Sequence, residues 1–311
     1  MSKQLHPSIA AILTISAAFG QTSKSPDLQG TWMTSTLTPL ERPAEFENKP
    51  ALTEQEAVEY AKKTLQQLNR DRRDGGGEVD VGRGYPEAFF DRGTTLARIG
   101  QTFPTSLVFD PPNGRIPPVT PEAMRKLAAE RTEARAHPAD RAANRSLQER
   151  CLLSGATGPP MLPGIYNNNF QIVQTPDYVM IVSEMIHDVR VIPLDGRSHP
   201  PPSVRLWMGD SVGHWEGQTL VVDTTNFTEN TSFHGSDTNL HLIERFTRAD
   251  PKTIVYEFTI DDPTAFTKSW SARLPLVPSD GPIYEYACHE GNYALRDILA
   301  GAREEERKAQ H

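Results

Sequence analysis

The feature that most constrains the fold is a series of β segments in the C-terminal half. Between about residues 165 and 290, short runs of β-branched and aromatic residues alternate with turns of Pro, Gly, Asp and Asn. This spacing is typical of antiparallel strands that follow one another in a meander. So many strands favour a closed barrel or a strongly bent sheet. The expected strands are 170–175, 178–184, 187–194, 204–208, 219–224, 240–247, 253–260, 269–276 and 283–288.

A different pattern covers residues 45–150, which are charged and have helical periodicity. Thr53 begins a capping box with Glu56, and apolar residues then recur at helical spacing. Thr120 followed by Pro121 predicts the start of a second helix. We therefore predict a mainly β fold with a helical insertion over about 50–150. A last helix is expected at the C-terminus, packing Leu295, Ile298, Leu299 and Ala302.

The N-terminus has the pattern of a signal peptide. Lys3 precedes an apolar run from Ile9 to Gly20, which is too short to span a bilayer. Small residues at Ala18 and Gly20 predict cleavage near Gly20. The alternative, a buried N-terminal helix, is disfavoured by the polar residues that follow at once. We expect residues 1–20 to be removed and residues 27–311 to form one secreted or periplasmic domain with its helical insertion at 45–150.

The net charge restricts the possible binding partners, and the two cysteines bear on the cellular compartment. The formal net charge is −8, which argues against nucleic acid and anionic membrane surfaces as partners. No later segment has the length of a membrane span. In an oxidising compartment the two cysteines, Cys151 and Cys288, are expected to pair. A nucleophilic thiol in Cys288-His289 is the alternative, but neighbours on a strand point to opposite faces.

Glu244 interrupts an apolar row with Leu242 and Phe246 on one strand face. If the following turn is 249–252, Glu244 lies opposite Glu257, and like charges that close would raise the pKa of one carboxyl. Such a pair provides one acid and one base. If the loop is one residue longer, Glu244 faces Phe258 and the pair does not form. A further alternative is that arginines 245, 248 and 273 satisfy both carboxylates.

His187 is the second candidate for acid–base chemistry, on the same side of its expected strand as Val189 and Val191. A single histidine on an apolar face is often a hydrogen-bonded core residue, and that alternative stays open. Polar neighbours favour a binding site. These candidate substrate-binding residues are Tyr166, Asn168, Glu184 and His289, whereas His234 and His241 are expected to be solvated.

A two-residue turn at Glu216-Gly217 would pair Trp215 with Gln218. Asp210, His214 and Asp223 would then share the opposite face. This set has metal-ligand chemistry, but no His-x-His or His-x-x-x-His spacing supports it, and a solvated face is the alternative. We predict neither a metal nor another cofactor.

Long motifs carry a resemblance to known proteins. YNNNFQIVQTPD (166–177), SEMIHDVRVIPLDG (183–196) and GHWEGQTLVVDTTNF (213–227) resemble a family of exported bacterial proteins of uncharacterised function. The resemblance implies export and one compact unit, but no reaction or catalytic residue. Gly30-Thr31-Trp32 is similar to the Gly-x-Trp of the lipocalin first strand, which favours a lipocalin-like barrel over a sandwich.

These observations lead to a cofactor-independent enzyme as the first hypothesis. Acid–base side chains in a barrel pocket would act on a small organic substrate by hydrolysis, elimination, isomerisation or cyclisation, as a hydrolase, lyase, isomerase or cyclase. The alternative is a lipocalin-like protein that binds a small molecule without chemistry. A third possibility is an interaction domain that uses the charged helices at 53–73 and 121–150. The oligomeric state is left open by the sequence.

Overall fold

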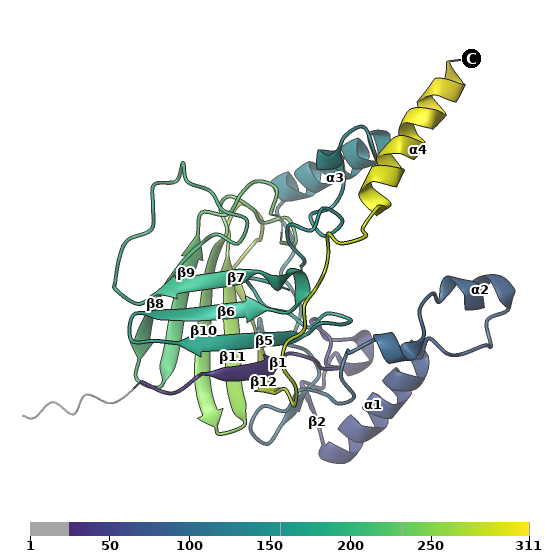
Figure 1. The fold of residues 1–311 in the computed structure, drawn as a ribbon. Helices are drawn as coiled ribbons and strands as arrows, with labels where there is room; N and C mark the ends of the chain where they lie inside the picture. Colours follow the sequence, from purple (N-terminus) through teal and green to yellow (C-terminus); the bar gives the residue numbers. More distant parts are fainter. Residues whose placement is uncertain (1–24, 156, 232, 311) are drawn as a thin grey trace, which may run out of the picture.

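The computed structural model describes residues 25–155, 157–231 and 233–310. The predicted signal peptide, residues 1–20, lies outside these ranges. Within them, nine strands form a nearly closed antiparallel barrel, as the strand spacing predicts (Figure 1). One further short strand, β4, pairs with β12. The order around the barrel is β7-β6-β5-β1-β12-β11-β10-β9-β8. The bounds are β1 (Gly30–Met33), β4 (Val108–Asp110), β5 (Asn169–Gln174), β6 (Tyr178–Ser183), β7 (Val189–Pro193), β8 (Asp210–Glu216), β9 (Thr219–Thr225), β10 (His241–Asp250), β11 (Thr253–Asp261) and β12 (Trp270–Pro278).

Strand β1 connects the two halves of the sheet. Its Trp32 is paired with Phe170 of β5 on one side and with Pro278 of β12 on the other. The barrel therefore departs from a simple meander, because its N-terminal strand lies between two strands that are far apart in sequence. The ends of the strand order, β7 and β8, meet through side chains, where Nε of Arg190 donates to Oγ of Ser211 at 3.1 Å.

Aromatic side chains fill much of the barrel interior. The ring of Tyr256 lies 4.8 Å from that of Phe246 and 5.9 Å from that of Phe258. Trp270 and Phe170 are also fully buried. Burying each such side chain stabilises the fold by roughly 1.5–3 kcal/mol. A small barrel packed in this way is a solid core rather than a ligand chamber.

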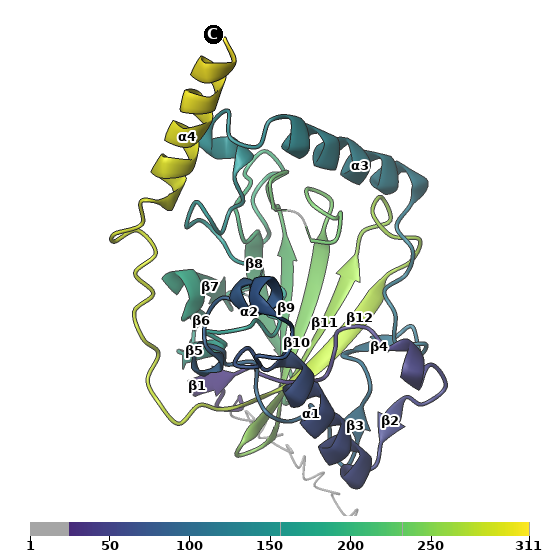
Figure 2. The same ribbon diagram turned by 90° about the vertical axis from the view of Figure 1, so that its right-hand side faces the viewer.

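The helical insertion lies between β1 and β5. The predicted capping box at Thr53 forms, and Thr120 caps a helix that has Pro121 in its first turn. Figure 2 shows α1 below α3 on this side of the barrel, with α4 projecting away from the body. The helices are α1 (Glu54–Leu68), α2 (Gly77–Gly82), α3 (Pro121–Ala136) and α4 (Ala294–Ala309), with short η helices at Ala44–Phe46, Glu87–Phe89, Ala142–Asn144 and Met185–His187; β2 (Ala51–Leu52) pairs with β3 (Phe103–Pro104).

Two predictions about local structure were wrong. Residues 283–288 form no strand, because β11 occupies one edge of β12 while β4 and β1 occupy the other. Residues 204–208 contribute only an isolated bridge between Leu206 and Phe227. Helix α4 begins at Ala294, and the four residues that were expected to pack are partly but not fully buried: Leu295, Ile298, Leu299 and Ala302.

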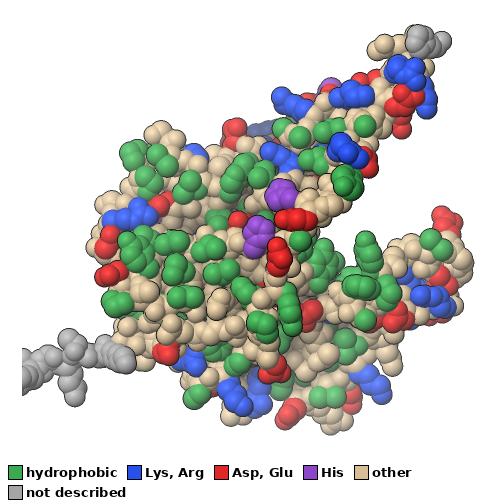
Figure 3. Space-filling view, viewed as in Figure 1, with side chains coloured by type: hydrophobic (Ala, Val, Ile, Leu, Met, Phe, Trp, Pro, Cys, Tyr) green, Lys and Arg blue, Asp and Glu red, His purple; other side chains and the backbone are tan. Residues whose placement is uncertain are grey.

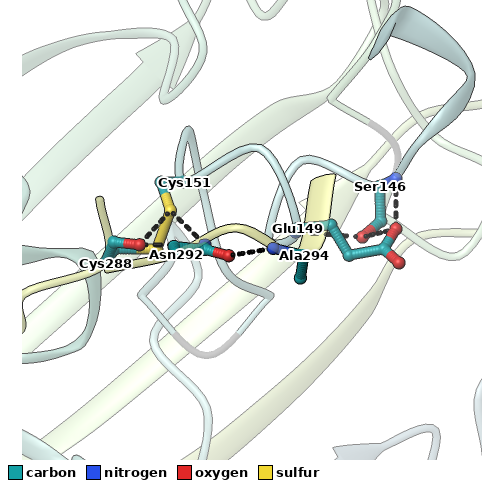
Figure 4. Close-up of a disulfide and its surroundings, with 6 residues drawn as sticks. All are labelled: Ser146, Glu149, Cys151, Cys288, Asn292 and Ala294. Carbon is teal, nitrogen blue, oxygen red and sulfur yellow. Dashed lines mark hydrogen bonds between the residues drawn. A yellow bond between two sulfur atoms is a disulfide. The ribbon is translucent and has the colours of Figure 1, made fainter. Parts of the chain in front are cut away.

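The predicted disulfide is present. Cys151 and Cys288 have their Cα atoms 5.8 Å apart and are joined through their sulfur atoms. Figure 4 shows the bond beside Asn292, whose side-chain amide donates to the carbonyl of Cys288 at 2.9 Å. The bond ties the segment that follows α3 to the segment that runs from β12 to α4. No helix in the described ranges has the length and apolar character needed to cross a membrane.

Candidate functional site

The barrel interior contains a buried ion pair. Glu244 is 0% and Arg190 7% exposed, and Nη1 of Arg190 lies 3.1 Å from Oε1 of Glu244. The second guanidinium nitrogen, Nη2, contacts Oε2. The hydroxyl of Tyr256 donates to Oε1 of Glu244 at 2.7 Å and accepts from the amide of Met161 at 3.0 Å. Each charged group therefore has several partners, which offsets the cost of burial.

The hydrogen bonds of this arrangement hold its three side chains in place. Burial, together with the negative charge of Glu244, raises the pKa of Tyr256 well above its ordinary value of 10.0, so the phenol remains a hydrogen-bond donor. The carboxylate of Glu244 is already engaged by Arg190 and Tyr256. Glu244 thus interrupts the apolar row as expected, but it serves the packing of the barrel.

The predicted carboxylate pair does not form. Glu244 is paired with Phe258, and Glu257 with Arg245, so the longer-loop alternative is the one observed. Glu257 points outward from the barrel, where its carboxylate lies 3.7 Å from the guanidinium of Arg273. The reason is a register shift near the turn, between Arg248 and Asp250 of β10.

His187 does not lie on the inner face of a strand. It ends a short 3-10 helix before β7, has a φ of 51°, and is exposed. Val189 and Val191, which were expected to mark the apolar inner side, are each 48% exposed. Arg190 points inward instead, because it has Glu244 as a partner there. The assignment of faces on this strand was therefore inverted.

Several of the other predicted residues do lie together. Glu184 is buried and accepts hydrogen bonds from the amides of Asn167, at 2.8 Å, and Asn169, at 2.5 Å. Asn168 faces a different partner, since its Oδ1 accepts from the amide of Gly164 at 2.6 Å. These contacts fix the turn that leads into β5. Both oxygens of the Glu184 carboxylate therefore have hydrogen-bond partners.

Tyr166 lines a small cavity of about 340 Å³ and hydrogen-bonds to Tyr286, whose pKa is raised by burial and by that neighbouring phenol. His289 is exposed and lines none of the cavities described below. The structure therefore brings Tyr166 and Glu184 to one region without placing His187 or His289 in a shared pocket.

On the expected face of the β8–β9 hairpin, the two aspartates contact a different histidine from the predicted one. The register is shifted by two residues, so Trp215 pairs with Leu220, and a shift of two leaves every side chain on its expected face. His214 contacts Glu216 rather than the aspartates.

His199, from the loop before β8, lies between the two aspartates instead. Its Nδ1 is 2.6 Å from Asp210 and its Nε2 is 3.1 Å from Asp223. His241, which was expected to be solvated, lies 2.8 Å from the other oxygen of Asp223. Within the described ranges, no three His, Cys, Asp or Glu side chains are grouped so as to hold a metal ion. The cluster instead fastens the loop to the barrel wall.

One large cleft lies outside the barrel interior. It has a volume of about 670 Å³, a size typical of small-molecule sites, and is formed where the end of α1 and the segment after it approach the barrel. Figure 3 shows a wide recess on the right of the molecule, between α4 and the part of the insertion around α2, although no residue of α4 or α2 lines the cleft. The cleft is lined by residues 36–40, Thr64, Gln67–Arg70, Arg83, Phe90, Arg92, Leu107 and 162–165.

Arginine side chains and an aromatic ring make part of the cleft lining positively charged and part of it apolar. The guanidinium carbons of Arg70 and Arg92 lie 5.4 Å and 4.5 Å from the centre of the Phe90 ring. Such cation–π contacts hold the charges beside apolar walls formed by Leu37, Leu40 and Leu162. No aspartate, glutamate or histidine is among the described residues that line it. The cleft suits binding of an amphipathic molecule better than proton transfer.

A second cleft, of about 500 Å³, has different chemistry. Glu41, Arg131 and His234 line it together with apolar residues that include Leu127 and Phe266. Burial lowers the pKa of His234, which favours the neutral imidazole, although the negative charge of Glu41 opposes this shift. His234 was expected to be merely solvated. In this setting it is a candidate acid–base residue.

Sequence reasoning missed the residues of both clefts. Arg70 and Arg92 lie in a charged segment that was interpreted as a helical surface, and only Phe89-Phe90 beside Arg92 signalled a stacking site. The bend that brings this segment to the barrel depends on long-range contacts, such as Asn168 Nδ2 donating to the carbonyl of Asp91. Comparison with known proteins adds no identity, because no protein-family model, curated protein or solved structure matches the chain.

Proposed function

We propose that the protein is exported and binds a small, amphipathic organic molecule in the 670 Å³ cleft between the helical insertion and the barrel. The observation that carries the proposal is the cleft itself, which combines apolar walls with Arg70, Arg92 and Phe90. The packed barrel interior supports this location, because its polar centre is occupied by Arg190, Glu244 and Tyr256. The disulfide and the N-terminal apolar run support export.

Blocking the cleft tests this proposal. Gln67 is exposed on α1 at the rim of the cleft, whereas Lys62 is exposed on the same helix and lines none of the cavities described above. N-phenylnaphthylamine, a neutral dye that fluoresces in apolar sites, serves as the probe. Gln67→Trp should weaken its binding by about tenfold or more, because the indole fills the cleft, while Lys62→Trp should not. Equal binding by both variants would overturn the proposal.

Acid–base catalysis is the second candidate function, and His234 in the 500 Å³ cleft favours it. A neutral imidazole beside Glu41 would act as general base, with Arg131 holding an anionic part of the substrate. Incubation with a library of esters and lactones, followed by mass spectrometry, should reveal a converted compound. His234→Gln should stop that conversion without changing the melting temperature, and His289→Gln serves as the control. Conversion that persists in His234→Gln would exclude this role.

A further inference from the structure

The 670 Å³ cleft contains a guanidinium that is incompletely hydrogen-bonded. The side chain of Arg92 is only 10% exposed. Its Nη1 donates to the carbonyl of Leu68 at 3.0 Å, but its buried Nε has no hydrogen-bond partner among the described residues. The remaining nitrogen, Nη2, lies 3.7 Å from the carboxylate of Glu87, which is too long for a hydrogen bond. One complete edge of the guanidinium, Nε with Nη2, therefore lacks an acceptor at hydrogen-bond distance among the described residues.

A buried donor without a partner costs free energy of folding, so the unpaired edge of Arg92 requires an explanation. The edge of a guanidinium that carries Nε and one Nη matches the two oxygens of a carboxylate. Within the protein, the nearest carboxylate, that of Glu87, already accepts a hydrogen bond from the backbone amide of Arg70 at 2.8 Å. It remains too far from Arg92 to satisfy that edge.

The three arginines of the cleft are not equivalent. Arg83 is neutralised by two ion pairs, with Asp74 at 2.6 Å and Asp80 at 2.5 Å. Glu87 lies 3.7 Å from the guanidinium of Arg92 and accepts from the backbone amide of Arg70 rather than from its guanidinium, so the cleft retains a positive charge next to Phe90. An anionic ligand would therefore be attracted to the Arg92 side of the cleft rather than to Arg83.

We propose that the ligand of this cleft is an amphipathic anion, whose carboxylate or sulfonate head group binds the Nε–Nη2 edge of Arg92 while its apolar body covers Phe90 and the leucine walls. This inference rests on the proposed function, since it specifies the ligand class of the same cleft. The head group completes the hydrogen bonds that Arg92 lacks, and Arg70 contributes a second, weaker attraction across the ring of Phe90. A small rotation of the long Arg92 side chain brings its open edge to the cleft.

A matched pair of dyes tests the inference. Anilinonaphthalene sulfonate and N-phenylnaphthylamine share a naphthyl-aniline body, but only the first carries an anionic group. Arg92→Gln should weaken binding of the sulfonate by about tenfold and leave binding of the neutral dye unchanged. Arg92→Lys should restore part of the loss, because the charge returns without the two-pronged edge. Arg296→Gln, which replaces an exposed arginine of α4 that does not line the cleft, should leave both dyes unaffected.

The outcomes separate the two claims. If Arg92→Gln weakens both dyes equally, or neither, with circular dichroism unchanged from the wild type, the anionic ligand class is wrong although the cleft still binds ligands. If Gln67→Trp leaves both dyes bound as in the wild type, the cleft itself is not the site and the proposed function fails. Adding salt provides a further readout, since higher ionic strength should weaken the sulfonate more than the neutral dye.

Discussion

Arg190 and Glu244 connect strands on the two sides of the open seam of the barrel. Arg190 lies on β7, at one end of the strand order, and its Nη1 is 3.1 Å from Oε1 of Glu244 on β10. The Nε of the same guanidinium donates to Ser211 on β8, the other end of that order, at 3.1 Å. One side chain thus connects three strands where backbone pairing between β7 and β8 is absent from the described residues. The buried ion pair therefore substitutes for a missing pair of strand edges.

Removing one partner of this ion pair should be strongly destabilising. Glu244→Leu leaves a buried guanidinium without its counter-charge, and we expect a loss of about 3–5 kcal/mol in the free energy of unfolding. The double variant Arg190→Met/Glu244→Leu should recover much of that loss, because no unpaired charge remains. Urea unfolding of the wild type and the three variants measures the coupling. Additive effects of the two single substitutions would show that the ion pair does not hold the seam.

Removing the hydroxyl of Tyr256 should have a smaller, separate effect on stability. Replacing it by Phe removes the donor to Glu244 and the acceptor for the amide of Met161, while the ring stays in the core. We expect Tyr256→Phe to lower the free energy of unfolding by about 1–3 kcal/mol, because a buried amide loses its partner. Thr259→Val, which removes a partly exposed hydroxyl on the outer face, is the control and should cost less. A loss no larger in Tyr256→Phe than in the control would contradict the buried network.

Reduction of the disulfide should loosen the cleft before the strands unfold. Cys151 is followed by the segment that forms the 162–165 wall of the cleft, and the bond closes a loop with a sequence separation of 137. In the chain-entropy model such a cross-link contributes roughly 4–5 kcal/mol. Binding of N-phenylnaphthylamine should weaken on reduction at a temperature where the far-ultraviolet circular dichroism is unchanged. Simultaneous loss of both signals would show that the bond stabilises the barrel as a whole.

The contact of His241 with Asp223 predicts a pH dependence of stability. The hydrogen bond from His241 lowers the pKa of Asp223 below 3.8, and the same bond raises the pKa of His241 above 6.5. The contribution of Asp223 is present above pH 3.8 and is lost as the pH falls through its lowered pKa. That of His241 is complete below pH 6.5 and is lost as the pH rises through its raised pKa.

The pair should therefore stabilise the fold most between these two pH values. Melting temperatures measured from about pH 5 to about pH 8 should fall more in the wild type than in His241→Gln. His289→Gln, which replaces an exposed histidine, should retain the wild-type profile. A profile for His241→Gln that matches the wild type would show that the contact contributes nothing to stability.

The sequence predicted the barrel well because strand periodicity and turn residues are local signals. Thr53 and Thr120 identified two helix starts for the same reason, and Cys151 and Cys288 had only each other as partners. The site was harder to predict, because it depends on the strand register and on contacts between residues far apart in the sequence. A bulge near Arg248 decided that Glu244 faces Phe258.

The orientation of β7 could not be predicted from the alternation of polar and apolar residues. Val189 and Val191 alternate with charged residues, so hydrophobicity alone places the valines inside. The structure places Arg190 inside, because Glu244 and Ser211 are available there as partners. Likewise, the cleft draws Arg92 from the insertion and Leu162 from the segment before β5, and no pattern in the sequence joins these two residues.

The central claim is that ligand binds between the insertion and the barrel wall, and hydrogen–deuterium exchange tests it most directly. With saturating anilinonaphthalene sulfonate, exchange of backbone amides should slow in residues 36–40, 64–70 and 162–165, the segments that line the cleft. Amides around Glu244 and Tyr256 should exchange as slowly with the dye as without it. Protection confined to the strands that carry those two residues, with no change in the cleft segments, would contradict the account.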